Sequence, residues 1–460
     1  MRYLNTRTDL SIPRLFIHGT RVRARLGLFS FLVSLTILTY AAGAATVHFR
    51  LFPYPQLWQS YAEMKDFVEH WKNDLGIEPT RYLVAGRGSA GNEVGLQRDR
   101  AARGLRVVAG YFRDRAAATG AILLDAQGTE LHFWPIDYQR IAAYIEEDFP
   151  HARHTFLHGF ELLSDGSIVV SFDSGGMLAR LDSCGEVMWA LPGGYHHAVS
   201  LAGDGSLWVV GGPGSELYPT SISKIDADAG TLLRTIDFDD SLLARMGKGV
   251  FFIRRLEDAP EPEWLPDPLH LNDVEVLDAS MADAFPLFEA GDVMLSLRSL
   301  NLVVVIDSED LHLKWWQHGP WHRQHDPDFL ANGRISVFGN NMNGDASRII
   351  EIDPVTRKTQ VVFEGSPQLP FYSWRRGNHQ RLDNGNILIT ESEAGRVFEV
   401  DRSGSLVWEY RNRFDGEQNL LVSAAMWVPS DFFDQGALHC QDRTAKMLAA
   451  ELSEPRRRQP

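Results

Sequence analysis

The sequence predicts an all-β fold, a six-bladed β-propeller, preceded by an N-terminal transmembrane helix and a short amphipathic helix. Three observations predict it. Strand-rich units of similar pattern recur along the chain, histidines recur at one position in those units, and one uncharged apolar run lies near the N-terminus. With 460 residues, 44% of them hydrophobic, the chain can bury a large core.

The N-terminal region predicts a membrane anchor. Six arginines between Arg2 and Arg25 precede an uncharged run, Leu26 to Val47, that is long enough to cross a bilayer as a helix. The arginine excess places the N-terminus in the cytoplasm and the main domain on the periplasmic side of the inner membrane. The alternative is a cleaved signal peptide, because Ala42 to Ala44 (AGA) offers a small-residue cleavage site. We favour a retained single-pass anchor because the apolar run is long and the arginine-containing segment before it is extended.

An amphipathic helix is expected next, in the stretch LWQSYAEMKDFVEHWKNDLG. Its apolar residues recur at helical spacing, at Leu57, Tyr61, Met64, Val68, Trp71 and Leu75. The expected division of the chain is therefore a basic cytoplasmic segment (1–25), an anchor (26–47), a juxtamembrane helix and linker (48–106), the propeller (107–440) and a C-terminal tail (441–460).

From about Val107 onward, short strand-like runs separated by turn residues align with one another. Stretches such as LLSDGSIVVSFD, SLAGDGSLWVVGG, FLANGRISVFGN and RLDNGNILITES repeat the pattern of apolar strand, Asp-Gly or Asn-Gly turn, and second strand. Six units of four strands are expected. A four-stranded sheet of this length cannot bury both faces alone, so the units must stack radially into a propeller.

Charge and cysteine content limit the choice of partners. A net charge of −15 argues against a nucleic-acid surface, which needs clustered lysine and arginine. The two cysteines, Cys184 and Cys440, have no metal or redox spacing. They can pair in an oxidising compartment, which the sequence does not decide.

Histidines recur on the first strand of the units. His158, for example, lies seven residues before the turn residue Asp165, and His325 lies seven before Asn332. Since the first strand of each blade lines the central channel, these imidazoles are expected to converge there. The alternative is that each histidine bonds a carbonyl and merely fills the axis. The residues in register are His158, His197, His270, His325 and His379.

An arginine accompanies the histidines. Aligned turns place Arg298 opposite Asn340, at the end of a second strand, where a planar and permanently charged group can face the same mouth. Histidines with Arg298 and the nearby Asn272 predict an anion site that contains a nucleophile or a proton carrier. Zinc or iron is the competing chemistry, because imidazole suits both metals. A fixed arginine would repel such a cation, so we expect no metal and no cofactor.

At these motifs the sequence resembles a known family, the bacterial aryl sulfotransferases that do not use a nucleotide sulfate donor. The matching stretches, between about His196 and Tyr410, are HHAVSLAGDGSLWVV, HLNDVEVL, DVMLSLRSLNLVVVID, QHDPDFLANGRISVFGN and RVFEVDRSGSLVWEY. The resemblance implies transfer of a sulfuryl group from an aryl sulfate to a phenol. The implied intermediate is a sulfohistidine.

The resemblance also assigns roles. The transiently sulfated histidine of the Gln-His motif falls on His325, the His-x-Asn pair on His270 and Asn272, the arginine on Arg298, and the upstream histidine on His197. We place His379 and Asn340 with Asn272 as substrate-binding candidates. Gln324 and Asp326 are expected to orient the ring of His325, although Asp326 can also merely begin a turn.

This chain departs from the family pattern in its anchor, in a longer spacing between His270 and Arg298, and in the additional His379. Two other classes of function stay open. One is a non-catalytic, membrane-tethered propeller that acts as a binding or assembly scaffold. The other is a metal-dependent propeller hydrolase.

Overall fold

The computed structural model describes residues 16–49, 51–75, 77–87, 94–97, 99–113, 115, 117–145, 156–173, 176–214, 220–247, 250–251, 267–341 and 344–440. Most of the predicted basic segment 1–25 and all of the predicted tail 441–460 lie outside these residues, as does most of the insertion before His270. The chain forms two compact units, residues 1–80 and 81–460.

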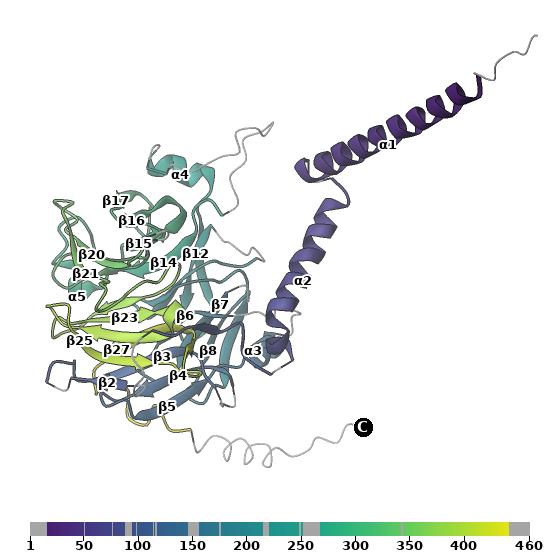
Figure 1. The fold of residues 1–460 in the computed structure, drawn as a ribbon. Coiled ribbons are helices and arrows are strands. Elements are labelled where there is room, and N and C mark those ends of the chain that lie inside the picture. Colours follow the sequence, from purple (N-terminus) through teal and green to yellow (C-terminus); the bar gives the residue numbers. More distant parts are fainter. Residues whose placement is uncertain are drawn as a thin grey trace, which may run out of the picture. The chain divides into compact units, whose positions relative to one another are not determined.

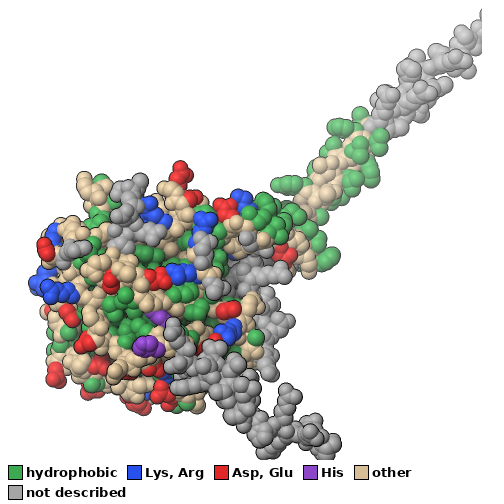
Figure 2. All heavy atoms as spheres, turned by 90° about the horizontal axis from the view of Figure 1, so that it is seen from below, with side chains coloured by type: hydrophobic (Ala, Val, Ile, Leu, Met, Phe, Trp, Pro, Cys, Tyr) green, Lys and Arg blue, Asp and Glu red, His purple; other side chains and the backbone are tan. Residues whose placement is uncertain are grey.

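The first unit contains two helices, α1 (Phe16–His48) and α2 (Tyr54–Asp74). Within α1, the stretch Leu26–His48 is long and apolar enough to cross a membrane, with a mean hydropathy of 1.8, and none of it is buried. Figure 2 shows its apolar side chains lying open along the helix. A signal sequence near an N-terminus would have the same properties. The predicted amphipathic helix is present as α2.

The second unit is the predicted six-bladed β-propeller (Figure 1). Blades 2 to 5 each take four consecutive antiparallel strands, the first innermost. Blade 2 is β6 (Phe156–Leu162), β7 (Ile168–Asp173), β8 (Met177–Leu181) and β9 (Val187–Pro192). Blade 3 is β10 (Val199–Leu201), β11 (Ser206–Val210), β12 (Ser221–Asp226) and β13 (Leu232–Asp237). Blade 4 is β14 (Leu271–Val276), β15 (Val293–Leu297), β16 (Leu302–Ile306) and β17 (Leu313–His318). Blade 5 is β18 (His325–Phe329), β19 (Ile335–Gly339), β20 (Arg348–Ile352) and β21 (Thr359–Glu364).

The two remaining blades join the ends of the propeller. Blade 1 takes its innermost strand, β27 (Val422–Val428), from the end of the domain and pairs it with β3 (Leu105–Tyr111), followed by β4 (Thr119–Leu124) and β5 (Glu130–Pro135). Blade 6 is β22 (His379–Arg381), β23 (Ile387–Glu391), β24 (Arg396–Val400) and β25 (Leu406–Arg411), with β2 (Val94–Leu96) added at its outer edge. A separate ribbon pairs β1 (Leu83–Ala85) with β26 (Gln418–Leu420). The circle is therefore closed by hydrogen bonds between the two ends of the domain.

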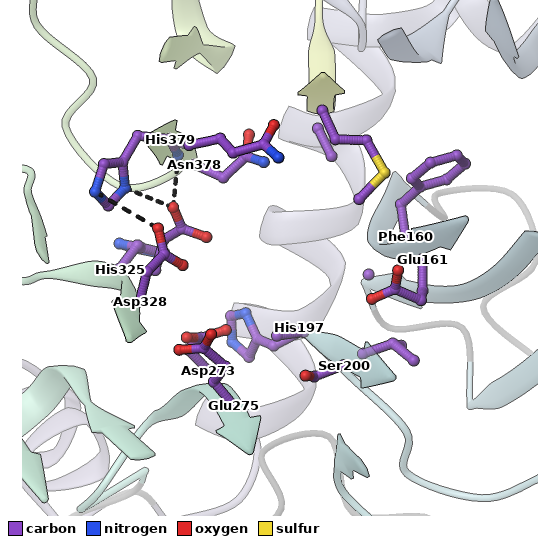
Figure 3. Close-up of a pocket in the computed structure, with 18 of the residues that line it drawn as sticks. Phe160, Glu161, His197, Ser200, Asp273, Glu275, His325, Asp328, Asn378 and His379 are labelled. Atoms are coloured by element: carbon purple, nitrogen blue, oxygen red, sulfur yellow. Dashed lines mark hydrogen bonds and ion pairs between the residues drawn. The ribbon is translucent and has the colours of Figure 1, made fainter. Parts of the chain in front are cut away.

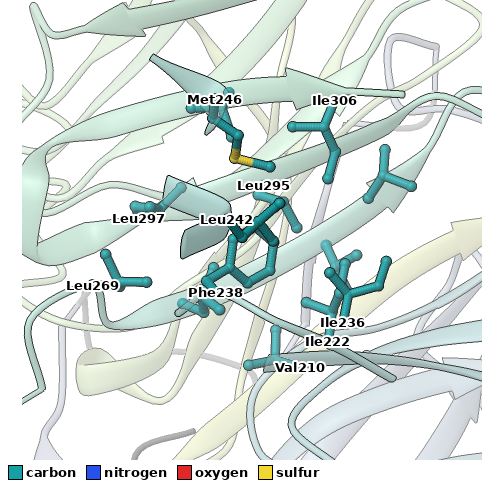
Figure 4. Close-up of a cluster of buried hydrophobic side chains, with 14 of the residues drawn as sticks. Val210, Ile222, Ile236, Phe238, Leu242, Met246, Leu269, Leu295, Leu297 and Ile306 are labelled. Carbon is teal, nitrogen blue, oxygen red and sulfur yellow. The ribbon is translucent and has the colours of Figure 1, made fainter. Parts of the chain in front are cut away.

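The core lies between neighbouring blades. Each pair of adjacent sheets encloses one cluster of buried apolar side chains, and the cluster between blades 3 and 4 is drawn in Figure 4. The second and third strands of a blade are consequently buried on both faces, as in β15 and β16, where every residue is buried. This explains why they read as continuous apolar runs instead of alternating ones.

Turns and short helices complete the unit. Gly333, in the Asn-Gly turn of blade 5, has a φ of +77°, and a Cβ there would lie 2.3 Å from the carbonyl oxygen of Ala284. Only glycine suits that turn. Three short helices were not predicted: α3 (Tyr138–Ile145), α4 (Asp240–Met246) and α5 (Ala279–Ala282). The cysteines are both free thiols, and Cys440 donates a hydrogen bond to the carbonyl oxygen of Ser183, next to Cys184.

Candidate active site

A cavity of about 390 Å³ runs along the propeller axis (Figure 3). Its wall is formed by the innermost strand of every blade, and it carries four of the five histidines predicted to converge: His158, His197, His325 and His379. A second cavity, of about 220 Å³, is lined by histidines, Asp173, Trp374 and three arginines, Arg298, Arg375 and Arg376. We call it the arginine cavity. His158, His197 and Arg376 line both cavities and therefore lie between them.

Local irregularities of the backbone direct side chains toward the cavities at the propeller axis. The ladder between the first two strands shifts register in β6, β14 and β18, at the positions that carry His158, Asn272 and Asp326. Such bulges redirect side chains that regular pleating would send elsewhere. His197 and His270 adopt left-handed backbone conformations, with φ of 62° and 48°. Non-glycine residues in that region cluster at functional sites.

The ring of His325 is held in one tautomer by Asn340. The Nδ2 group of Asn340 donates to two carbonyl oxygens, those of Ser373 and Arg376, each at 2.9 Å. The amide oxygen must therefore face His325, whose Nδ1 lies 2.7 Å from it and must donate. The other nitrogen, Nε2, then carries a lone pair, and it is buried with no hydrogen-bond partner among the described residues.

Burial and charge keep this imidazole neutral. His325 is 6% exposed. Burial, and then the adjacent charge of Arg298, lower the pKa of His325 to about 3. A neutral imidazole with a free lone pair is a nucleophile at ordinary pH.

Arg298 and His270 lie together beside this ring. Arg298 follows β15 directly, in the short 3₁₀ helix Arg298–Leu300, and its backbone N–H donates to the carbonyl oxygen of His270 at 3.1 Å. The Nδ1 atom of His270 contacts the carboxylate of Asp267. Burial lowers the pKa of His270, and the bond to Asp267 acts in the opposite direction. The imidazole of His270 can therefore carry a proton with a carboxylate behind it.

The remaining histidines form a stack. The ring of His197 lies 4.1 Å from that of His158, 4.0 Å from that of His196 and 5.0 Å from that of His270, between centroids. Burial, and then the neighbouring imidazoles, hold the pKa of His197 well below its ordinary value. At the edge of the stack, Asp173 lies 3.0 Å from both His196 and Arg376. The stack is thus neutral at its centre and ion-paired at its rim.

Five carboxylates also line the axial cavity. They lie on β6, β14 and β18, and Figure 3 shows several of them pointing into the cavity. Burial, and then repulsion from Asp326, raise the pKa of Asp273 and of Asp328 well above ordinary values. Burial raises the pKa of Glu161 to about 7. The set is Glu161, Asp273, Glu275, Asp326 and Asp328.

The environment of His379 differs from that predicted. Asp326, expected to orient His325, instead accepts hydrogen bonds from the backbone N–H of His379, at 2.5 Å, and from its ring Nδ1, at 2.7 Å. The other ring nitrogen contacts the hydroxyl of Ser336. Gln324 also bonds elsewhere, to Ser296 and to the carbonyl oxygen of Leu302, both about 3 Å away. His379 is therefore fixed by protein groups on both nitrogens.

Two groups near the axis have ligand atoms within 4.8 Å of one another: His158 with His196 and His197, and Asp326 with Asp328 and His379. In the first group, His196 Nε2 is bonded to Asp173. In the second, both nitrogens of His379 are bonded to protein groups. We assign no metal to either group.

The structure thus gathers all the predicted residues around one axis, in different roles. His270 and Arg298 lie at the arginine cavity, while His325, Asn272 and His379 line the axial cavity. Asn340 lies behind His325 and orients it. Four tryptophans lie close to these strands in the sequence, and of these Trp374 lines the arginine cavity. Trp315 and Trp321 are buried between blades, and Trp316 faces outward.

The sequence analysis did not anticipate the five carboxylates of the axial cavity or the Asp173–Arg376 ion pair. A pattern that indicates the carboxylates is present, since Asp273 and Glu275 are two residues apart, as are Asp326 and Asp328. Residues at that spacing on a strand share a face. The pair joins blade 2 to the segment before blade 6, two regions far apart in sequence, and no pattern indicates it.

The propeller holds a buried, neutral imidazole close to an arginine at its axis, an arrangement suited to the binding of anions. Comparison with known families agrees. Residues 159–413 match the family model named arylsulfotransferase (ASST), and the chain belongs to this family. Membership and fold support sulfotransferase activity with aryl sulfates and phenols as substrates. No curated protein matches the chain.

The solved structures that resemble this chain are distant from it in sequence. A protein of unknown function from Bacteroides caccae is 12% identical, with a TM-score of 0.46, over 70% of this chain and 98% of that one. A putative 6-phosphogluconolactonase from Bacteroides fragilis is 14% identical, with a TM-score of 0.39, over 75% and 97%. A streptogramin B lyase is 13% identical, with a TM-score of 0.39, over 73% and 88%.

Proposed function

We propose that this chain is a membrane-anchored aryl sulfotransferase. It moves a sulfuryl group from an aryl sulfate to a phenolic acceptor through a sulfohistidine at His325. The observation that carries the proposal is the unpartnered lone pair on His325 Nε2, fixed by Asn340 and kept neutral beside Arg298.

In the first half-reaction, the His325 Nε2 lone pair attacks sulfur, the nitrogen–sulfur bond forms, and the sulfur–oxygen bond to the aryl group breaks. The phenolate leaves with the electron pair. The non-transferred sulfuryl oxygens hold negative charge in this loose transition state, and Arg298 stabilises them. Because the cation is already in place, no reorganisation is needed when the charge develops.

In the second half-reaction, the acceptor hydroxyl attacks the same sulfur, the nitrogen–sulfur bond breaks, and His325 recovers its lone pair. The hydroxyl proton goes to His270, which is neutral before the step because burial lowers its pKa. Asp267 stabilises the imidazolium that results. This proton is available to the phenolate that leaves in the next cycle.

For the division of the chain we propose a cytoplasmic segment (1–25), an inner-membrane anchor (26–47), a juxtamembrane segment, the catalytic propeller and a tail (441–460). The linker expected over 48–106 is shorter than that, because the propeller unit already begins at residue 81 and includes β2. The catalytic side is extracytoplasmic.

The test is direct detection of the intermediate in detergent-purified full-length protein given 4-nitrophenyl sulfate without acceptor. We expect one equivalent of nitrophenol and the mass of one sulfuryl group on the peptide that contains His325. The His325→Asn variant should lose both signals, because asparagine has no nucleophilic nitrogen. The His379→Asn variant is the control and should keep the adduct. An adduct that persists in His325→Asn and disappears in His379→Asn would reverse the assignment, and no adduct in any variant would favour a scaffold.

A further inference from the structure

The axial cavity presents an excess of negative groups to whatever binds in it. Five carboxylates, from blades 2, 4 and 5, line a space of about 390 Å³ (Figure 3). That volume lies within the range of small-molecule sites, about 300–1,000 Å³. The five carboxylates are those of Glu161, Asp273, Glu275, Asp326 and Asp328.

No fixed cation balances these groups. Among the described residues, no lysine or arginine forms an ion pair with any of the five. The two arginines on the cavity wall are engaged elsewhere: Arg376 bonds Asp173 at 3.0 Å, and Arg381 bonds Glu351. The carboxylates instead repel one another, and Asp273 adds to the repulsion on both Glu275 and Asp328. Buried carboxylates that have no lysine or arginine partner favour either protonation or a bound cation.

Two buried polar atoms are further evidence, separate from the carboxylates, that this cavity binds a ligand. His325 Nε2 and Asn272 Oδ1 both belong to side chains that line the cavity and are more than nine-tenths buried, and neither has a hydrogen-bond partner among the described residues. The Asn272 amide is oriented by its Nδ2, which donates to the carbonyl oxygen of Gln324 at 2.7 Å. Its oxygen is therefore an acceptor, suited to an O–H or N–H of the ligand and not to a sulfuryl oxygen.

The geometry of transfer places the organic part of the substrate in this cavity. If His325 attacks sulfur in line with the departing oxygen, the acceptor oxygen must later approach from the side that the leaving group vacated. Donor and acceptor aryl groups then occupy one place in succession. The guanidinium of Arg298, which stabilises the sulfuryl oxygens, lines the arginine cavity, and this leaves the axial cavity for the aryl group.

We propose that this enzyme selects aryl substrates bearing a positively charged substituent, an ammonium group that the axial carboxylates bind. The proposal rests on the proposed function and specifies its substrate class. The ammonium nitrogen donates to Asp273, Glu275 or Asp328, while the phenolic oxygen faces His325. Hydrogen bonds to buried charged groups of this kind change affinity by about ten- to a hundred-fold.

The experiment compares two acceptors of almost equal size, 4-(2-aminoethyl)phenol and 4-(2-hydroxyethyl)phenol, with 4-nitrophenyl sulfate as donor and the full-length protein. We expect kcat/KM to favour the amine by about ten-fold or more. Glu275→Gln and Asp328→Asn, two variants on different blades, should each bring the ratio toward one. The matched control is Glu417→Gln, an exposed glutamate on a loop, which should keep the full preference.

The outcomes distinguish failure of the ammonium site from failure of the sulfohistidine mechanism. A normal nitrophenol burst with equal use of both acceptors would overturn the cation site and leave the sulfohistidine mechanism standing. Absence of the burst would remove the proposed function itself. A divalent ion is the other cation that carboxylates attract. Stoichiometric metal in the purified protein, lost together with turnover of the uncharged acceptor on chelation, would also overturn the ammonium site.

Discussion

At the level of single residues, the protonation of the His325 ring depends on the side chain that lies behind it. Asn340 was grouped with substrate-binding residues from its position opposite Arg298. The structure gives it three protein contacts, and together they leave His325 one possible tautomer. A sequence cannot show this, because the two carbonyl groups that fix the amide come from a segment more than thirty residues away.

The same residues predict an unusual pH dependence. Because its pKa is lowered to about 3, His325 stays deprotonated at every pH above that value. We expect the single-turnover rate of nitrophenol release, whose leaving group needs no proton, to stay level between pH 8 and pH 5. A solvent-exposed histidine, with a pKa near 6.5, would instead lose activity as the pH falls through that value. A decline of that shape in stopped-flow traces would show that His325 is not the nucleophile or is not shielded as described.

A second prediction at this scale concerns Arg298. Lysine keeps the charge but replaces a planar guanidinium with a single ammonium, so two sulfuryl oxygens can no longer be held in a fixed geometry. We expect Arg298→Lys to lower kcat by about 10²–10³ with little change in stability. Arg375→Lys, in the same cavity, serves as the comparison and should lose less. Equal turnover of Arg298→Lys and the parent protein would exclude Arg298 from the transition state.

At the level of elements, the sequence showed the repeating units, the turns and the histidine register, because each depends on neighbours along the chain. His158 and His325 were placed correctly on first strands by their distance from the turn. What stayed hidden depends on contacts between elements: the bulges in β14 and β18, and the turning of Asp326 toward His379 on the next blade. An alternating strand pattern predicts which face of the sheet a side chain occupies. It does not predict which residue of a neighbouring blade contacts that side chain.

The join between blades 6 and 1 contains a fully buried ion pair. Arg106 on β3 and Glu399 on β24 lie 2.6 Å apart with both side chains completely buried, and the guanidinium also stacks on Trp408 at 4.8 Å. Removing one partner leaves an uncompensated buried charge, so we expect Arg106→Met to lower the free energy of unfolding by about 3–5 kcal/mol. The double variant Arg106→Met/Glu399→Leu should recover much of that loss.

Urea unfolding followed by tryptophan fluorescence measures both changes. Arg140→Met is the control, because its ion pair with Glu186 is half exposed and should contribute less than about 1 kcal/mol. If Arg106→Met unfolds at the same urea concentration as Arg140→Met, the pair does not hold the ring closed.

At the level of the whole molecule, the fate of α1 decides where the enzyme works. A retained anchor predicts that the protein purified from membranes has the mass of the full 460-residue chain and resists extraction at alkaline pH. Cleavage after Ala44 predicts a lighter, extractable protein. Intact-mass measurement distinguishes the two, and a product that begins at Ala45 would contradict the anchor while leaving the propeller unaffected.

The strand β27, which closes the ring, also completes the axial cavity, and it is the last strand of the domain to be synthesised. Ser423 to Met426, on this strand, form part of the wall of the axial cavity, yet they are among the last described residues of the domain. While the chain is being made, blades 2 to 5 can assemble, but the edge of β3 stays unpaired until Val428 has emerged. A nascent or prematurely terminated chain therefore has no finished axial cavity, and the unpaired edge of β3 is open to pairing with another chain.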